Sequence, residues 1–367
     1  MHRFKLCPIY FLGLIAYSLP AYWVPLYGDN RDQQGECPTT EETYWLAAEE
    51  GCVNPSEECP DPAGQIGCDG MGGEKVVGSD LYKDYDWYTT APMTDYEFAR
   101  ENNLWGIWFP EGPPAFRPFI ADPRQVTFSI GWRFDDRLLG NNLVPVSFGD
   151  VFPIFRWVDL WNYRGDLELD IEGDVWAIFD PLHESAPLID ADYYVGFPLT
   201  YLFGNWAFRL RGYHISTHIG DEFLLDHPHF DRRNPSIEAF DFYFSDQFTR
   251  DIRLYGGAGW VTRQDDSFRV GSFYFQAGTE IRFSELGFHD YNNRLYGEPF
   301  FAMDFFYQTH FKHHINSNFA LGYEWGKVSG LRRRVRVYVL YHDGYSVEGQ
   351  FSKSPTHYFG IGGSYGY

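Results

Sequence analysis

From Gln125 to the end of the chain, hydrophobic and polar residues alternate with a period of two. Between Val126 and Asp135 every second residue is aromatic or aliphatic, and the positions between hold Thr, Ser, Gly, Arg or Asp. The same alternation returns in residues 167–175, 273–282 and 334–342. Because successive side chains of a strand point to opposite faces, each stretch predicts a β-strand with one apolar and one polar face.

The polar positions carry opposite charges on different strands. Residues 168–174 place acids there, whereas residues 334–336 place arginines. The polar face of a soluble β-sandwich meets water and has no need of such complementarity, so the pattern favours a narrow lumen crossed by ion pairs. We therefore predict an all-β fold, an antiparallel transmembrane β-barrel with its apolar face turned to lipid.

The spacing of the alternating stretches predicts about twelve strands, beginning near residues 125, 145, 165, 191, 206, 236, 251, 268, 297, 316, 332 and 356. An even count places both ends of the barrel in the periplasm. The Gly204-Asn205 turn is then periplasmic, and the long connections 220–235 and 343–355 lie outside. Periplasmic turns of such barrels are usually short. The connection 284–296 is an exception, because it is long yet is placed in the periplasm by this count.

Composition agrees with a barrel and excludes two other classes. The 367-residue chain is 44% hydrophobic and 20% aromatic, but its mean hydropathy is −0.38. No run of about 20 apolar residues follows the N-terminal stretch, which argues against a helical membrane protein. Abundant Tyr and Phe suit the aromatic girdles of a barrel. The net charge of −22 argues against a nucleic acid partner, because phosphates would be repelled.

The N-terminus has the pattern of an export signal. Arg3 and Lys5 precede the apolar stretch 6–19, and small residues follow, so we expect residues 1–21 to be a signal peptide. A short buried helix is the alternative. Residues 22–120 form a Cys-, Pro- and Trp-rich segment, periplasmic or plugging the lumen, ahead of a barrel at 121–367. Four cysteines of this segment suggest two disulfides in any of three pairings, or else a zinc site: Cys37, Cys52, Cys59 and Cys68.

The C-terminal strand points to the membrane in which the barrel sits. Phe359, Ile361, Tyr365 and Tyr367 share one face and are separated by small residues. This ending resembles the C-terminal assembly signal of outer-membrane barrels. The resemblance implies the bacterial outer membrane as the location, and the barrel assembly machinery and outer-membrane lipid as partners.

The segment 213–222 contains residue types that support nucleophilic catalysis. On a strand, His214, Ser216 and His218 project from one face, and a histidine beside a serine can take its proton when a third group orients the ring. Glu238 on the next strand is our choice for the third group. Asn234 and Asp226 are alternatives to it.

This His-x-Ser arrangement resembles the catalytic strand of outer-membrane phospholipase A and of the lipid A deacylases. The resemblance implies an acyl hydrolase with Ser216 as nucleophile and His214 as base, with calcium as a cofactor to be considered. Thr217 stands where the phospholipase motif has an asparagine. Asp221 and Glu222 could hold calcium together with loop carbonyls.

The face on which His214 and Ser216 lie depends on Gly212. If alternation continues unbroken through this glycine, the pair faces lipid. If Gly212 forms a β-bulge, the phase flips and the His-Ser-His row joins Arg209 and Arg211 in a lumenal polar network. We favour the bulge, because it hides polar groups from hydrocarbon.

Two further clusters have candidate chemistry. The spacing of His227, His229 and Asp231 is compatible with zinc or copper, although we favour solvated loop residues, because one short run rarely completes a metal site. The basic run 332–336 could meet anionic lipid headgroups, or could pair with the acids of the third strand inside the lumen, which we favour.

Five stretches together resemble a family of bacterial outer-membrane proteins known only as a domain of unknown function. They are residues 119–124, 190–196, 214–222, 234–238 and 253–257, and the resemblance spans about 115–367. It implies the barrel but no activity. We therefore expect a structural or pore-type barrel with a charged lumen, with a lipid acyl hydrolase and a metal-binding surface barrel as alternatives. Oligomeric state is left open by the sequence.

Overall fold

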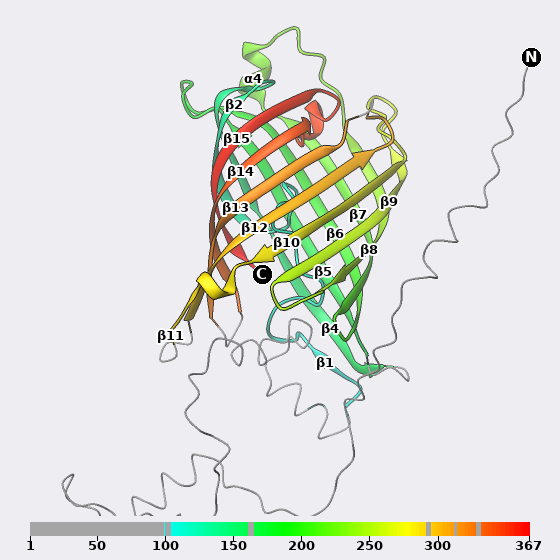
Figure 1. Ribbon diagram of the computed structural model, residues 1–367. Helices are drawn as coiled ribbons and strands as arrows, with labels where there is room; N and C mark the ends of the chain where they lie inside the picture. The colour runs from blue at the N-terminus through cyan, green and yellow to red at the C-terminus, as the bar shows by residue number, and fades with distance from the viewer. Residues whose placement is uncertain (1–98, 100–103, 161–164, 291–294, 312–313, 328–331) are drawn as a thin grey trace, which may run out of the picture. The chain divides into compact units, whose positions relative to one another are not determined.

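The computed structural model describes residue 99 and residues 104–160, 165–290, 295–311, 314–327 and 332–367 (Figure 1). The predicted signal peptide and the four cysteines of the predicted disulfides lie outside the described residues.

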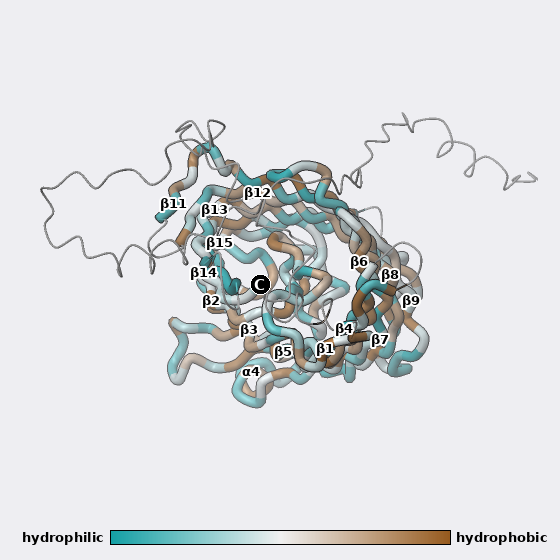
Figure 2. Tube along the Cα trace, turned by 90° about the horizontal axis from the view of Figure 1, so that it is seen from below, coloured by the Kyte–Doolittle hydropathy of each residue, from teal (hydrophilic) through white to brown (hydrophobic). Residues whose placement is uncertain are grey.

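Twelve strands form a closed antiparallel barrel. The wall consists of β2 (Phe128–Asp136), β3 (Gly140–Phe148) with its continuation β4 (Asp150–Leu160), β5 (Gly165–Phe179), β6 (Leu188–Phe203), β7 (Trp206–Ile219), β8 (Ser236–Asp246), β9 (Ile252–Gln264), β10 (Phe273–Arg282), β12 (Leu295–Gln308), β13 (Asn316–Lys327), β14 (Arg334–Tyr345) and β15 (Pro355–Gly366). β3 and β4 count as one wall strand because both pair with β5, one after the other. β15 pairs with β2 and closes the ring, which Figure 2 shows from below. The prediction of an antiparallel barrel of about twelve strands is confirmed.

The connections carry short additional elements. β1 (Gly106–Trp108) pairs with β4, and β11 (Phe288–Asp290) pairs with β12, so part of the long predicted connection 284–296 extends the sheet. η1 (Ser284–Leu286) precedes β11 in the same connection, whereas α4 (Asp221–Asp226) and η2 (Gly349–Phe351) lie in other connections. Within the described residues, no helix is both long and apolar enough to cross a membrane.

The wall has an apolar outer face and a polar inner face, as the alternation predicts. On β14 the outward Val335 and Val337 are 47% and 55% exposed, whereas the inward Arg334 and Arg336 are each 2% exposed. The inward acids of β5 at positions 168, 170, 172 and 174 are likewise buried. An exposed apolar band around a polar interior is typical of transmembrane barrels.

The two ends of the barrel differ in their connections. The connections 220–235 and 346–354 lie at one end, which we call the loop end and which is uppermost in Figure 1. The tight turn at Gly204-Asn205 and the hairpin with β11 lie at the other end, which we call the turn end. Gly204 has a φ of 55°, a left-handed conformation that glycine adopts without strain.

The chain before β2 runs through the lumen. Ten of the fifteen residues 113–127, which we call the inner segment, are buried and none is exposed, and Phe116 and Phe119 pack against Tyr243 and Tyr255 of the wall. In Figure 1 the inner segment lies within the barrel. Because the segment occupies the space between the walls, the lumen is not an open channel at this level.

Two sequence expectations about the strands need correction. The basic run does not pair with the acids of β5: Arg333 pairs with Asp150, and Arg334 and Arg336 pair with Glu324 of β13. Glu324 lies directly opposite Arg336 on β13, the neighbour of β14, whereas β15, β2 and β3 separate β14 from β5. Tyr367 does not join the outward face either, since it is 8% exposed and lies under the Arg333 guanidinium.

Candidate functional site

The phase of β7 decides which face carries His214 and Ser216. β7 pairs with β6 and with β8 without any register shift through Gly212. Arg211, Tyr213 and Ile215 face the lumen, where Arg211 pairs with Asp241 and Tyr213 packs on the inner wall. The row of His214, Ser216 and His218 therefore faces outward, and the expected bulge at Gly212 is wrong.

Gly212 is explained by the residue opposite it. Gly212 pairs with Phe240 of β8, and a Cβ atom at this position would lie 2.9 Å from the phenyl ring of Phe240. The ring of Phe240 covers the outward face of the glycine, and such aromatic cover of a strand glycine is a known device for holding register. The glycine therefore makes room for a ring and does not change the phase of the strand.

The outward face around His214 combines residues from three strands. Glu238 of β8 lies directly opposite His214, while Tyr193 of β6 and Ser236 of β8 lie opposite Ser216. Within the described residues no hydrogen bond joins His214 to Ser216 or to Glu238, and Glu238 pairs with Arg263 at 3.2 Å. The three predicted residues are thus neighbours on one face, but their side chains do not form a hydrogen-bonded triad.

These polar residues lie where the outward apolar band ends. Toward the turn end, the outward positions of β7 and β8 hold Leu210, Phe240 and Phe242, which are between 51% and 55% exposed. Toward the loop end, polar residues begin at His214 and Glu238. In membrane-embedded barrels such a boundary lies at the level of the lipid headgroups, where polar side chains remain hydrated.

The other residues predicted for this region lie elsewhere. His218 packs edge-on against Tyr193, with ring centroids 5.4 Å apart. Asp221 and Glu222 form the exposed first turn of α4 and do not join Arg209 and Arg211, which are in the lumen. The alternatives to Glu238 do not approach His214, since Asn234 bonds to Asp265 and Asp226 ends α4.

The loop histidines form no ligand cluster. His227 stacks on Phe223 of α4 and its Nδ1 lies 3.0 Å from the Phe223 carbonyl oxygen, while Asp231 pairs with Arg233. In the part of the chain that the structure describes, no three His, Cys, Asp or Glu residues are grouped so that they could hold a metal ion. The structure therefore does not bring His227, His229 and Asp231 together as one ligand set.

The lumen at the turn end is filled by charged side chains. Glu324 accepts hydrogen bonds from Arg282, Arg334 and Arg336 at 2.8 to 3.0 Å, and all four side chains are at most 3% exposed. Glu280 pairs with Arg253 at 3.2 Å on the same side of the lumen. Buried charges of this density require mutual pairing, because an unpaired charge would lose its hydration without compensation.

Wall side chains hold the inner segment through its backbone. The amide of Ala115 donates to Glu168, and the amide of Ile120 donates to Glu280. Arg253 donates to the carbonyl oxygens of residues 117 and 118 at 2.9 and 3.3 Å. Because these bonds are made to main-chain groups, they hold the inner segment independently of its own side chains. For the same reason, the hydrophobic–polar pattern of the sequence could not predict them.

The connection 346–354 closes the loop end. Glu348 pairs with Arg133 at 2.7 Å, and the amide of Gly349 donates to Asp192. Burial by itself raises the pKa of the Glu348 carboxyl, but Arg133, Arg124 and the Ser346 hydroxyl outweigh it and lower this pKa to about 2. Phe351 completes an apolar cluster over the mouth of the lumen.

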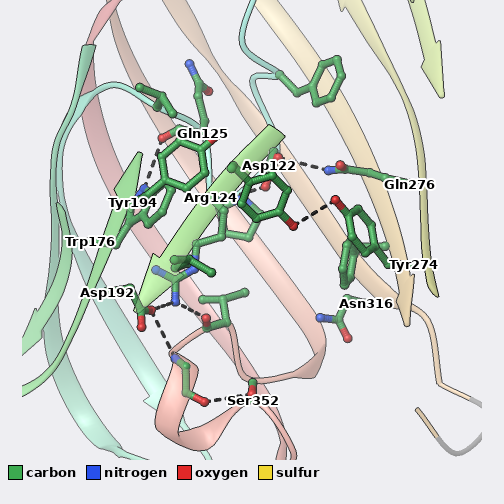
Figure 3. Close-up of a pocket in the computed structure, with 18 of the residues that line it drawn as sticks. Asp122, Arg124, Gln125, Trp176, Asp192, Tyr194, Tyr274, Gln276, Asn316 and Ser352 are labelled. Atoms are coloured by element: carbon green, nitrogen blue, oxygen red, sulfur yellow. Dashed lines mark hydrogen bonds and ion pairs between the residues drawn. The ribbon is translucent and has the colours of Figure 1, made fainter. Parts of the chain in front are cut away.

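A cavity of about 260 Å³ remains between the inner segment, the wall and this connection. Figure 3 shows Trp176 and Tyr194 on one side of it and Tyr274 and Gln276 on the other. Arg124 of the inner segment joins Asp192 and the carbonyl oxygen of Val347, at the boundary between the cavity and the connection. The sequence prediction missed this cavity, although the motif 119–124 supplies part of its lining.

Comparison with solved structures finds several barrels of bacterial outer membranes. Outer membrane phospholipase A from Escherichia coli matches with 12% identity and a TM-score of 0.44, covering 65% of this chain and 91% of that chain. The transport unit of the autotransporter AIDA-I from Escherichia coli has 11% identity and a TM-score of 0.33, covering 76% and 99%. LpxR from Salmonella typhimurium has 12% identity and a TM-score of 0.32, covering 66% and 100%. Structural similarity at this level does not indicate a shared chemistry.

Among curated proteins, none matches this sequence. A family model gives a clear assignment, in agreement with the five stretches noted in the sequence. The model described as "Protein of unknown function (DUF1207)" matches residues 99–367, and the chain belongs to that family.

Proposed function

We propose that this protein is an outer-membrane β-barrel of structural type whose lumen is closed at rest. In this proposal the loop end faces the cell exterior and the turn end faces the periplasm. The exposed apolar band meets lipid, and the C-terminal strand β15 is the part that the barrel assembly machinery takes up. The charged side chains of the lumen then pair with each other, and they do not line a water-filled path.

The inner segment is the observation that carries this proposal. It is bonded to the wall at both of its ends: Glu168 accepts from the Ala115 amide, and Asp174 accepts from the Thr127 amide at 3.0 Å. Between these points Arg253 and Glu280 bind its backbone. A segment held by charged groups at several points does not leave the lumen by a small fluctuation, because each charge would lose its partner.

Conductance measurements test the closed lumen. The full chain, purified and inserted into planar bilayers, is expected to show no steady current. Arg253→Met removes the donors to two carbonyl oxygens of the inner segment and is expected to give brief openings. Arg263→Met is the matched control, because Arg263 lies on the same strand but is exposed and pairs with Glu238 on the outer face. A steady current through the wild-type protein would contradict the proposal.

A lipid acyl hydrolase is the second candidate, and one observation favours it. His214 and Ser216 share the outward face with Glu238, at the edge of the apolar band. Ser216 Oγ would attack an ester carbonyl carbon while His214 takes its proton and passes it to the leaving alcohol; water then hydrolyses the acyl-enzyme. The absent His214–Ser216 hydrogen bond would have to form when lipid binds, as catalytic hydrogen bonds often do.

Fatty-acid release tests this candidate. Purified barrel is incubated with labelled phospholipid and with lipid A, in the presence and absence of calcium. Ser216→Ala is expected to abolish release, whereas Ser236→Ala, which alters the serine directly opposite on β8, is expected to leave it unchanged. Equal release by wild type and Ser216→Ala would eliminate Ser216 as the nucleophile.

A further inference from the structure

The inward positions of two neighbouring strands change character along the barrel. Near the middle of the lumen they are charged, with Arg211 on β7 and Asp241 on β8 forming an ion pair. Toward the loop end the same inward rows continue with Tyr213 and Ile215 on β7 and Ile237 on β8. A water-filled lumen would be expected to remain polar along its length. The change from charged to apolar inward residues therefore indicates that this part of the lumen makes apolar contacts.

These apolar residues line the cavity from two sides. One cluster joins Val126 of the inner segment to Val151, Trp176 and Ile215, and the other joins Tyr274, Val270 and Phe306 to Ile237. Tyr213 packs against both clusters. The two clusters face each other across about 260 Å³ of space, which is room for a small molecule (Figure 3).

The polar side chains at the cavity are mostly occupied by the protein itself. The Gln276 amide donates to Asp122 and Asp304 and accepts from Tyr243. Both polar atoms of the Asn316 side chain bond to the backbone of Tyr345. Groups that are already satisfied offer a ligand little hydrogen bonding, so they do not favour a sugar or another polyol.

Three lining residues are exceptions. Within the described residues, Gln125 Nε2 and Arg209 Nε are buried without a hydrogen-bond partner, and Arg124 has donors that reach the open space. Arg124 Nη2 bonds to Asp192 and to the Val347 carbonyl oxygen, but within the described residues its Nε and Nη1 form no hydrogen bond. The side chain is 22% exposed and its guanidinium lies 5.0 Å from the centre of the Trp176 ring. Arg124 therefore presents free donors at one end of a cavity whose lining combines apolar side chains with polar ones that are mostly paired within the protein.

We propose that this cavity binds a small, mainly apolar molecule, aromatic or aliphatic, that carries a single hydrogen-bond-accepting oxygen. The apolar body lies between the clusters around Ile215 and Ile237, and the oxygen accepts from Arg124. This inference goes beyond the closed-barrel proposal, since a structural barrel has no need of such a site. It also does not depend on the outward His214 and Ser216.

Binding of 4-fluorobenzyl alcohol to the detergent-purified full chain tests the inference, followed by fluorine NMR. The wild type is expected to bind it saturably and more tightly than 4-fluorotoluene, which lacks the oxygen. Ile215→Trp fills the cavity and is expected to weaken binding at least tenfold. Leu210→Trp, on the outward face of the same strand, is the matched control and is expected to bind as the wild type does.

The remaining variants separate the two ends of the cavity. Arg124→Met is expected to keep binding of 4-fluorotoluene and to lose the preference for the alcohol. If Ile215→Trp does not fold, as judged by heat-dependent gel migration, Val270→Phe fills the cavity from the connection between β9 and β10. Equal signals from the filled variant and Leu210→Trp would mean partitioning into detergent and would overturn the inference. Saturable binding of glucose but not of the alcohol would overturn it as well.

Discussion

The ring of Phe119 in the inner segment lies flat on the ring of Tyr255 of β9, with centroids 3.7 Å apart and planes 7° from parallel. The Tyr255 hydroxyl donates to Asp304 of β12 at 3.0 Å. The stack therefore connects the inner segment with the hydrogen-bonded network of the wall. Stacked rings add directional contact to the free energy of burial.

Phe119→Ala tests this connection. Phe119 is 4% exposed, so its truncation should lower the free energy of unfolding by about 3 to 5 kcal/mol. Phe240→Ala removes a ring that is 55% exposed on the outer face and should have a smaller effect. Unfolding by urea in lipid vesicles, followed by gel migration, measures both. Equal losses would show that Phe119 contributes no more to stability than a ring on the exposed outer face.

Glu324→Ala tests the charge cluster at the turn end. Removing Glu324 leaves Arg282, Arg334 and Arg336 without their shared acceptor in a site where all are at most 3% exposed. Loss of one partner from a buried pair costs about 3 to 5 kcal/mol, and this cluster should fall in that range.

The control for the cluster is an exposed ion pair. Asp266 pairs with Arg269 at 2.5 Å, with side chains 88% and 70% exposed. Asp266→Ala should change the free energy of unfolding by less than about 1 kcal/mol, because water screens exposed pairs. Urea titrations of the two variants side by side measure the difference. Similar small losses would mean that Glu324 is dispensable.

The closure of the loop end should depend on pH through Glu348. Its folded-state pKa of about 2 lies below the ordinary value of 4.5, so its contribution is fully present above about pH 4.5. The contribution is lost as the pH falls toward 2, because the protonated carboxyl no longer pairs with Arg133. The loss is at most roughly 3 kcal/mol for a shift of this size.

Hydrogen exchange of residues 346–354 measures this dependence. Protection of the wild type should decrease between pH 4.5 and 2 after correction for intrinsic rates. Glu348→Gln should show lower protection than the wild type already at pH 7, and its protection should not decrease further through titration of residue 348. The comparison separates the effect of Glu348 from that of other nearby acids such as Asp192. The same pH profile in both proteins would rule out Glu348 as the cause.

Cysteine labelling tests the faces of β7. Ser216→Cys should react with a maleimide added to whole cells or vesicles, because the residue faces outward near the edge of the apolar band. Ile215→Cys should react much more slowly, since it faces the lumen and lines the cavity there. The reverse pattern would mean that a bulge at Gly212 does exist in the membrane.

The barrel could be predicted from the sequence because its signal is local. Alternation along residues 126–135 or 334–342 follows from the opposite directions of successive side chains, and no knowledge of neighbouring strands is needed. The same local rule, applied through Gly212, would also have placed His214 and Ser216 on the outward face. The expected bulge came instead from a desolvation argument that took those residues to lie within hydrocarbon.

Tertiary structure alone decided the features that depend on neighbours. The position of His214 at the edge of the outward apolar band follows from strand register. Gly212 is required because the ring of Phe240 on β8 covers it. Glu324 meets Arg336 because the two lie opposite each other on the paired strands β13 and β14, whereas Asp150 is far from Arg333 along the chain and meets it in the closed ring. Backbone bonds to Glu280 hold the inner segment. The alternation of residue types along one strand determines which way a side chain points, whereas what that side chain meets depends on the closed ring of strands.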